Sequence, residues 1–104
     1  MNCTNNDDSY LNLKSSVSDI AEKYFRCLQN LSESKNDKNS FSIYIKRVKD
    51  AYAKLDHLEQ RFINNEFFYQ DYPNWWKDKY CKSTFYRIKK QSMKDFLEAF
   101  NNAT

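Results

Sequence analysis

The chain has 104 residues, with 17 basic and 14 acidic side chains, one proline and no glycine. This length suits one domain built around a single core. The formal net charge of +3 is too small for a protein that coats nucleic acid with its whole surface. Without glycine the chain has no P-loop or dinucleotide-binding turn, so nucleotide-dependent chemistry is not expected.

Three cysteines, Cys3, Cys27 and Cys81, are too far apart in sequence for a zinc-ligand pair, and their odd number does not fit a disulfide framework. We therefore expect free thiols in a reducing compartment, and neither a metal nor another cofactor. The N-terminus, MNCTNNDDS, has no apolar signal core, and no segment has the length and hydropathy of a membrane span. These features predict a soluble, cytoplasmic protein with no membrane partner.

The first predicted element is a helix that ends near Leu31. Residues 1–8 are polar and are predicted to be a disordered N-terminus. Apolar residues then recur at three- and four-residue steps, which predicts a helix that begins at Ser9 or at the capping signal near Ser16. The apolar positions are Leu13, Val17, Ile20, Tyr24, Phe25, Leu28 and Leu31. The polar run 32–40 follows and predicts a loop.

A second helical period covers residues 43–62. Asp56, followed three residues later by Glu59, has the pattern of a capping box, which could restart a helix at His57. Without such a restart the stretch would be one helix of about 25 residues, which is long for a small domain, so we expect either a kink or a junction near Lys54–Asp56. We divide the domain here, into an N-terminal helical part (9–53) and a second part (54–104) of the same compact unit. The apolar positions are Ile43, Tyr44, Val48, Ala51, Tyr52, Leu55, Leu58 and Phe62.

The remaining segments predict a short helix and then a longer one. Pro73 suits a first helical turn, which predicts a short helix over 75–80. From about residue 82 to 101, one face is apolar: Phe85, Ile88, Met93, Phe96, Leu97 and Phe100. The opposite face carries Tyr86, Arg87, Lys89, Lys90 and Lys94. No strand-like alternation is present, so the fold is predicted to be all-α, with four or five helices and a C-terminal helix-turn-helix.

The sequence offers no catalytic constellation. The single histidine, His57, falls at a predicted helix start, and no motif supplies a nucleophile beside it, so an enzyme is not expected. Residues 62–76 are rich in aromatic side chains, which could stack on bases or build the core of a domain with few aliphatic residues. We favour the core, with at least one of Trp75 and Trp76 packed inward.

Positive charge is concentrated near the C-terminus. The segment 77–94 has seven basic residues and one acidic residue, Asp78. These charges lie at the start of a predicted helix, where free backbone N–H groups and the helix dipole also favour phosphate. Such a surface is either an ordinary solvated face or a site for DNA.

The stretch CKSTFYRIKK (81–90), with Met93, Phe96 and Leu97, resembles the recognition-helix segment of sigma-factor region 4-like helix-turn-helix domains. It is closer to phage late-transcription regulators of the ArpU/RinA type, and a small uncharacterised family in mollicutes shares the arrangement, including the paired tryptophans. The resemblance covers residues 54–100. These families usually have serine where this chain has Cys81, so we expect Ser83 to cap the helix instead and to shift its start by two residues.

The resemblance implies that the chain is a DNA-binding transcription regulator, acting alone or with RNA polymerase. It implies contacts to double-stranded DNA from Lys82, Ser83, Thr84, Tyr86, Arg87, Lys89 and Lys90. Arg87 would contact guanine, whereas Lys89 and Lys90 would contact phosphates. The alternative is a non-enzymatic helical adaptor that binds a protein such as an RNA polymerase subunit. Residues 9–33 have no counterpart in the resemblance, and this helix could contact a protein partner or form a homodimer.

Overall fold

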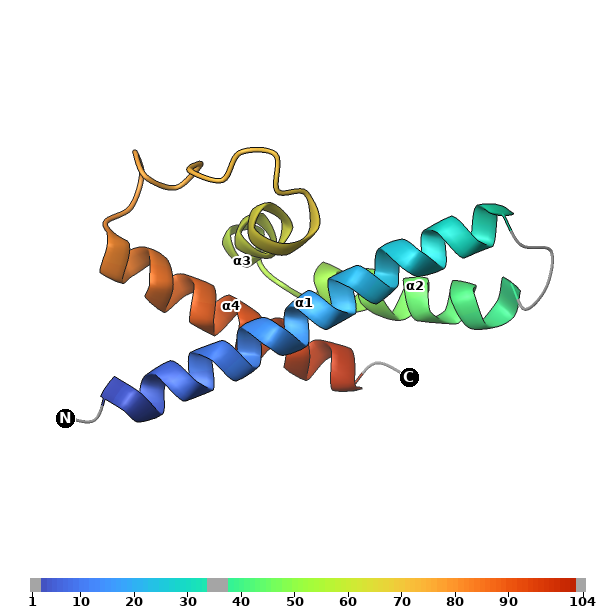
Figure 1. Ribbon diagram of the computed structural model, residues 1–104, viewed down its shortest axis with the longest axis horizontal. Coiled ribbons are helices and arrows are strands. Elements are labelled where there is room, and N and C mark those ends of the chain that lie inside the picture. The colour runs from blue at the N-terminus through green and yellow to red at the C-terminus, as the bar shows by residue number, and fades with distance from the viewer. Residues whose placement is uncertain (1–2, 34–37, 103–104) are drawn as a thin grey trace.

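The computed structural model describes residues 3–33 and 38–102, and within these ranges it contains helices and no strands (Figure 1). The elements are α1 (Cys3–Glu33), α2 (Lys38–Ala53), α3 (His57–Ile63), the π-helical turn η1 (Asn64–Phe68) and α4 (Lys82–Asn102). The predicted all-α class is confirmed.

Helix α1 is longer than its apolar period indicates. It begins at Cys3 rather than at Ser9 or Ser16, so the segment predicted to be disordered contains helical backbone from Cys3 onward. No glycine or proline precedes Ser9 to stop the helix from extending in that direction. Residues 1–2 lie outside the described part of the chain. The predicted loop over 32–40 is shortened from both sides by α1 and α2, and residues 34–37 are not described.

Of the two alternatives predicted near Lys54–Asp56, a kink or a junction, the structure has the junction. Helix α2 ends at Ala53, and Asp56 caps α3 by accepting a hydrogen bond from the Glu59 backbone N–H at 2.8 Å. The Glu59 carboxylate in turn accepts a weaker bond from the Asp56 backbone N–H at 3.4 Å. This reciprocal capping box satisfies two N–H groups that a helix start leaves without partners, which explains why one apolar period is divided into two helices.

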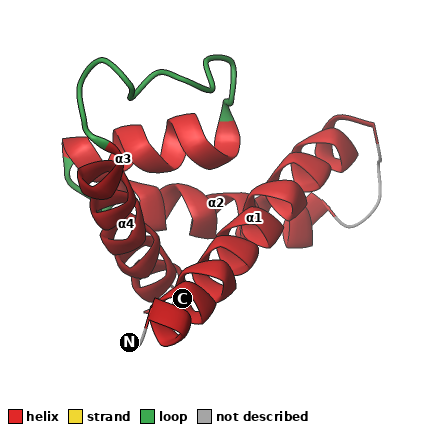
Figure 2. Cartoon of the chain, turned by 60° about the vertical axis from the view of Figure 1, so that its left-hand side comes forward, coloured by secondary structure: helices red, strands yellow, loops and turns green. Residues whose placement is uncertain are grey.

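The helices pack as a long hairpin joined to a compact end. The C-terminal half of α1 lies beside α2, and its N-terminal half crosses α4, while α3 contacts α4 from the other side (Figures 1 and 2). One apolar core connects them, made of Val17, Ile20, Ala21, Val48, Ala51, Leu55, Ile63, Phe67, Met93, Phe96 and Phe100. Because the hairpin extends beyond this core, the radius of gyration is 15.1 Å, compared with about 13 Å for a compact domain of this length.

Residues 69–81, the connector, run from η1 back over α3 to the start of α4 (Figure 2). The short helix predicted over 75–80 is wrong, because residues 73–79 form successive turns. Their hydrogen bonds mostly span three residues, as from the Lys77 N–H to the Asn74 carbonyl at 3.1 Å. The helix-turn-helix therefore lacks its first helix at the predicted position.

The turns let two adjacent rings reach the same neighbour. Neighbouring side chains on a regular helix point about 100° apart, whereas Trp75 and Trp76 both contact Phe85, with ring centroids 6.3 and 4.0 Å away. Aromatic packing thus outweighs the helical preference of this segment.

Among the described residues, no helix combines the length and hydropathy that crossing a membrane requires.

Candidate nucleic-acid interface

The spacing of buried residues along α4 decides which side chains face solvent. Phe85, Lys89, Met93, Phe96 and Phe100 are all buried, at steps of three or four residues that keep them on one side of the helix. On the opposite side, Ser83, Arg87 and Lys94 are exposed. This exposed side of α4 is the polar surface available to a ligand.

The start of α4 is capped by a thiol. The Phe85 N–H donates to the Cys81 carbonyl at 2.9 Å, so Cys81 occupies the capping position and the helix begins at Lys82. The prediction that Ser83 caps the helix and shifts its start by two residues is wrong. The Cys81 Sγ lies 3.2 Å from Thr84 Oγ1 and 3.5 Å from Ser83 Oγ. Hydrogen bonds from Thr84 and then Ser83 lower the pKa of the exposed Cys81 thiol from 9.0 to about 7.

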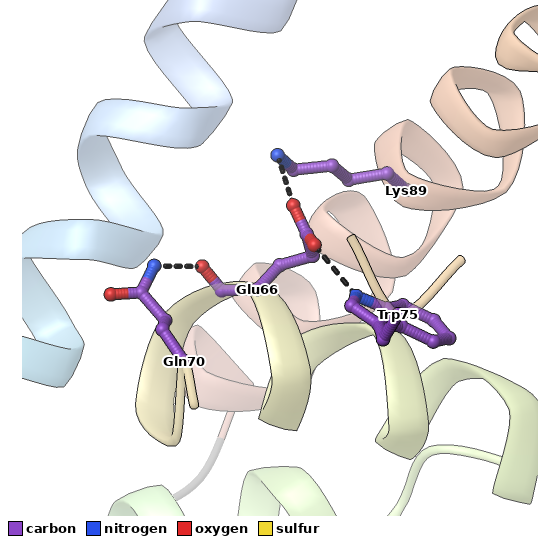
Figure 3. A network of polar contacts seen from close by, with 4 residues as sticks. All are labelled: Glu66, Gln70, Trp75 and Lys89. Atoms are coloured by element: carbon purple, nitrogen blue, oxygen red, sulfur yellow. Dashed lines mark hydrogen bonds and ion pairs between the residues drawn. The ribbon is translucent and has the colours of Figure 1, made fainter. Parts of the chain in front are cut away.

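Lys89 is the principal correction to the predicted site. Its side chain is 7% exposed, and its Nζ forms an ion pair with Glu66 Oε1 at 2.8 Å (Figure 3). The rings of Phe67, Tyr10 and Phe85 surround the ammonium at 5.4 to 5.7 Å. Lys89 was predicted to contact phosphate, but its charge is already neutralised inside the protein, so it does not belong to the exposed basic surface.

Burial alone would lower the pKa of Lys89. Hydrogen bonds to Glu66 and Tyr10, together with their charges, outweigh that effect and raise the pKa above its usual 10.5. These contacts favour the protonated form of Lys89, and its ion pair with Glu66 joins α4 to η1. Its position in the period was visible in the sequence, since it lies four residues after Phe85 and four before Met93.

Glu66 also holds the connector. Its Oε2 accepts a hydrogen bond from Trp75 Nε1–H at 2.8 Å, and its backbone carbonyl accepts one from Gln70 Nε2 (Figure 3). One carboxylate thereby joins η1, the connector and α4, and both of its oxygens have a partner. This arrangement fixes the path of the connector toward the start of α4.

An aromatic cluster completes the attachment. Phe62 is fully buried and contacts Trp75, Tyr80 and Phe85 at centroid distances of 5.0, 5.5 and 5.5 Å. Trp76 stacks on Phe85 at 4.0 Å with an interplanar angle of 16°. The prediction that at least one of the two tryptophans packs inward is confirmed, since both half-buried rings contact Phe85.

The other predicted contact residues differ in exposure. Lys82, Ser83 and Arg87 are exposed, whereas Thr84 and Lys90 are half-buried. Tyr86 is 40% exposed and packs edge-on against Tyr10 of α1, with centroids 5.6 Å apart. Its ring therefore also serves the contact between α4 and α1.

The connector adds two cations that the predicted site did not include. Lys77 and Lys79 are exposed, and the connector brings them to the same end of α4 as Lys82. We define the basic surface as the exposed or half-buried cations of this region: Lys77, Lys79, Lys82, Arg87, Lys90 and Lys94. Lys77 and Lys79 could have been predicted as part of this surface, because both lie in the basic segment 77–94.

A second polar group lies at the other end of α4. Burial, and then a hydrogen bond to Asp95, raise the pKa of Glu59 from 4.5 to about 7.

Within residues 3–33 and 38–102, no group of three or more histidine, cysteine and acidic side chains could hold a metal ion. His57 is exposed and is the first residue of α3.

Comparison of the chain with protein-family models, curated proteins and solved structures found no match in any of the three. The resemblance to sigma region 4-like and ArpU/RinA-type domains therefore stays a prediction.

Proposed function

We propose that the chain is a DNA-binding transcription regulator that presents the solvent side of α4 and the adjoining connector to the phosphates of duplex DNA. The basic surface is the observation that carries this proposal. Six cations lie along the connector and α4, and Asp78 is the single carboxylate within the segment that contains them. The start of α4 adds backbone N–H groups and the positive end of its dipole.

The contacts differ from those the resemblance implied. Arg87 is exposed, and its planar guanidinium suits bidentate contacts to phosphate or to guanine. Lys82, Lys77 and Lys79 supply phosphate contacts nearer the connector, and Lys90 and Lys94 supply them further along α4. Lys89 takes no part, because it is paired with Glu66.

The direct test is the affinity for a duplex measured over a range of salt concentrations. Binding through the basic surface predicts that log K falls linearly with log salt, and that Arg87→Ala makes the slope shallower by about 0.9 for one lost phosphate contact. Lys90→Ala is expected to have a similar or smaller effect. If the wild-type chain does not bind duplex at low salt, the proposal fails.

Lys46→Ala is the matched control. It removes one positive charge from α2, where Lys46 is exposed and paired with Asp50 at 2.8 Å. Helix α2 meets the C-terminal end of α4, since Arg47 Nε donates to the Phe100 carbonyl at 2.9 Å. The control changes net charge by the same amount, away from the basic surface, and should leave the salt slope unchanged.

One observation favours the alternative, a helical adaptor for a protein partner such as an RNA polymerase subunit. The hairpin exposes the apolar side chain of Ile43 in α2, which is 68% exposed. A groove beside Ile43 is lined by Lys23, Cys27, Ser40, Phe41, Ile43, Tyr44 and Arg47. Because this surface is remote from the basic surface, Ile43→Asp should abolish capture of polymerase, or self-association, while leaving duplex binding intact.

A further inference from the structure

A pocket that shares no residue with the basic surface lies between α1, α2 and η1. It is an open pocket of about 180 Å³ lined by Tyr24, Val48, Lys49, Tyr52, Asn64, Phe68 and Tyr69. Four of these seven residues are aromatic, and the exposed lining is mostly apolar. An apolar cavity of about 150 Å³ is large enough to bind benzene, so this pocket matches a ligand with a single ring.

The aromatic walls are held in place by the core. Phe68 packs edge-on against Tyr24 at 5.5 Å and contacts Phe96 of α4 at 6.2 Å. The Tyr52 hydroxyl donates to the Gln60 carbonyl at 3.3 Å. A preformed pocket with fixed rings binds a planar ligand without a large cost of ordering its walls.

The pocket coincides with the one irregular helical segment of the described chain. Asn64 and Phe68 are the first and last residues of the π-helical turn η1, and both line the pocket. The Tyr69 N–H donates to the Asn64 carbonyl at 2.8 Å, which closes the wide turn. Single π-helical turns occur frequently at functional sites, and here the turn supplies two of the lining residues of the pocket.

Lys49 supplies the charge of the site. The ion pairs of the described residues involve Arg26, Lys46 and Lys89, and none includes Lys49. No acidic residue stands three or four positions from Lys49 in α2 either, because those positions hold Lys46, Tyr52, Ile45 and Ala53. Burial raises the pKa of Tyr24 and of Tyr52 above 10.0, so both phenols stay uncharged at neutral pH. The pocket therefore combines apolar rings with one available positive charge.

We propose that this pocket binds a small molecule with one aromatic ring and one carboxylate, with the ring between Tyr24, Phe68 and Tyr69 and the carboxylate facing Lys49. The side-chain amide of Asn64, which also lines the pocket, offers a further hydrogen-bond donor and acceptor. This site does not depend on the proposed DNA binding, because the pocket and the basic surface share no residue.

The test uses sodium benzoate as the probe, with backbone amide shifts of the full-length chain recorded by NMR. Benzyl alcohol, which keeps the ring without the charge, and acetate, which keeps the charge without the ring, are the matched probes. Benzoate should shift the amides of Val48, Asn64, Phe68 and Tyr69 in a saturable way, more tightly than either matched probe.

Two variants separate the charge from the ring contacts. Lys49→Met keeps the aliphatic stem and should weaken benzoate about two- to fivefold, the range for an exposed ion pair, while leaving benzyl alcohol unchanged. Tyr69→Ala should weaken both aromatic probes. Lys46→Met, on the same helix but outside the pocket, should change neither.

The proposal is overturned if benzoate shifts map to the basic surface instead of the pocket, or if no saturable shifts appear. If benzoate and benzyl alcohol bind with equal affinity, the proposed contact between the ligand carboxylate and Lys49 is overturned. Because Lys49→Met and Tyr69→Ala replace exposed side chains, both variants are expected to fold, and their unchanged spectra away from the pocket verify this.

Discussion

Lys89 and Arg87 stand two residues apart on α4 and carry the same charge, yet they lie in opposite environments. Lys89 lies on the core side, paired with Glu66 at 2.8 Å and enclosed by rings. Arg87 lies on the solvent side and is exposed. The difference comes from position in the helical period, since a residue four places from Phe85 faces the core whatever its charge. The basic segment of α4 therefore contains two kinds of cation: Lys89 is paired inside the protein, whereas Arg87 is exposed to solvent.

The largest expected effect comes from breaking the buried pair. Lys89→Ala leaves the Glu66 carboxylate buried without its cation, so we expect a loss of about 3–5 kcal/mol in the free energy of unfolding. Arg87→Ala should change that free energy by no more than about 0.5 kcal/mol. Urea denaturation followed by circular dichroism measures both. Similar losses from the two variants would contradict the division of α4 into a structural and an available side.

A double substitution keeps this prediction testable if Lys89→Ala fails to fold. Lys89→Met with Glu66→Gln removes both charges and retains an acceptor for the Trp75 N–H. Replacing a whole buried pair by uncharged groups of similar size is often close to neutral. The double variant should therefore be much more stable than Lys89→Ala, and a loss as large as that of the single variant would mean that the pair is not the cause.

The next effect concerns the connector. Trp75→Phe keeps an aromatic ring against Phe62 but removes the N–H that donates to Glu66 at 2.8 Å. Hydrogen bonds to charged groups contribute about 1.5–3 kcal/mol, and we expect a loss in that range. Faster amide hydrogen exchange over 69–81 should accompany it, because Glu66 fixes the path of the connector. Unchanged exchange would show that ring packing alone holds this segment.

A smaller effect is expected from the carboxyl pair Glu59–Asp95. The pKa of Glu59 is raised in the folded chain from 4.5 to about 7, so this group stabilises the fold fully below pH 4.5 and loses that contribution as the pH rises through 7. Both residues are only partly buried, which limits the change to about 1 kcal/mol. Glu59→Gln keeps an acceptor for the capping box and should remove this pH dependence. An identical pH profile for the variant and the wild type would contradict the assignment.

The last prediction concerns reactivity at the start of α4. The Cys81 thiol has a pKa of about 7 and is exposed, whereas Cys27 is buried. In a Cys3→Ser background, alkylation by iodoacetamide should occur at Cys81, with a midpoint near pH 7. Thr84→Val removes the leading hydrogen bond and should move the midpoint toward the usual value of 9.0. If Cys81 is alkylated with a pH midpoint near 9.0 while Thr84 is still present, the hydrogen bonds at the start of α4 do not lower its pKa, and the capping geometry is contradicted.

Local signals in the sequence predicted much of the fold. The break at Asp56 was readable because a capping box depends on side chains three residues apart, and the apolar periods located α2, α3 and α4. The short helix at 75–80 was wrong because its outcome depends on Phe62 and Phe85, which are distant in sequence. Packing of Trp75 and Trp76 against those rings replaced helical geometry with turns.

The candidate site was predictable only in part. Lys82, Ser83 and Arg87 are exposed as expected, but Lys89 required recognising that a cation can occupy a core position when a buried carboxylate faces it. Glu66, its partner, lies in the π-helical turn η1, which no sequence pattern predicted. The pocket at η1 was unpredictable for the same reason, since it joins residues of α1, α2 and η1.

The salt dependence of duplex binding, compared between Arg87→Ala and the double variant Lys89→Met with Glu66→Gln, tests the central claim most directly. If the solvent side of α4 contacts DNA and the core side does not, Arg87→Ala lowers the slope of log K against log salt by about 0.9, and the double variant leaves it unchanged. A lowered slope in the double variant with no change in Arg87→Ala would contradict the claim.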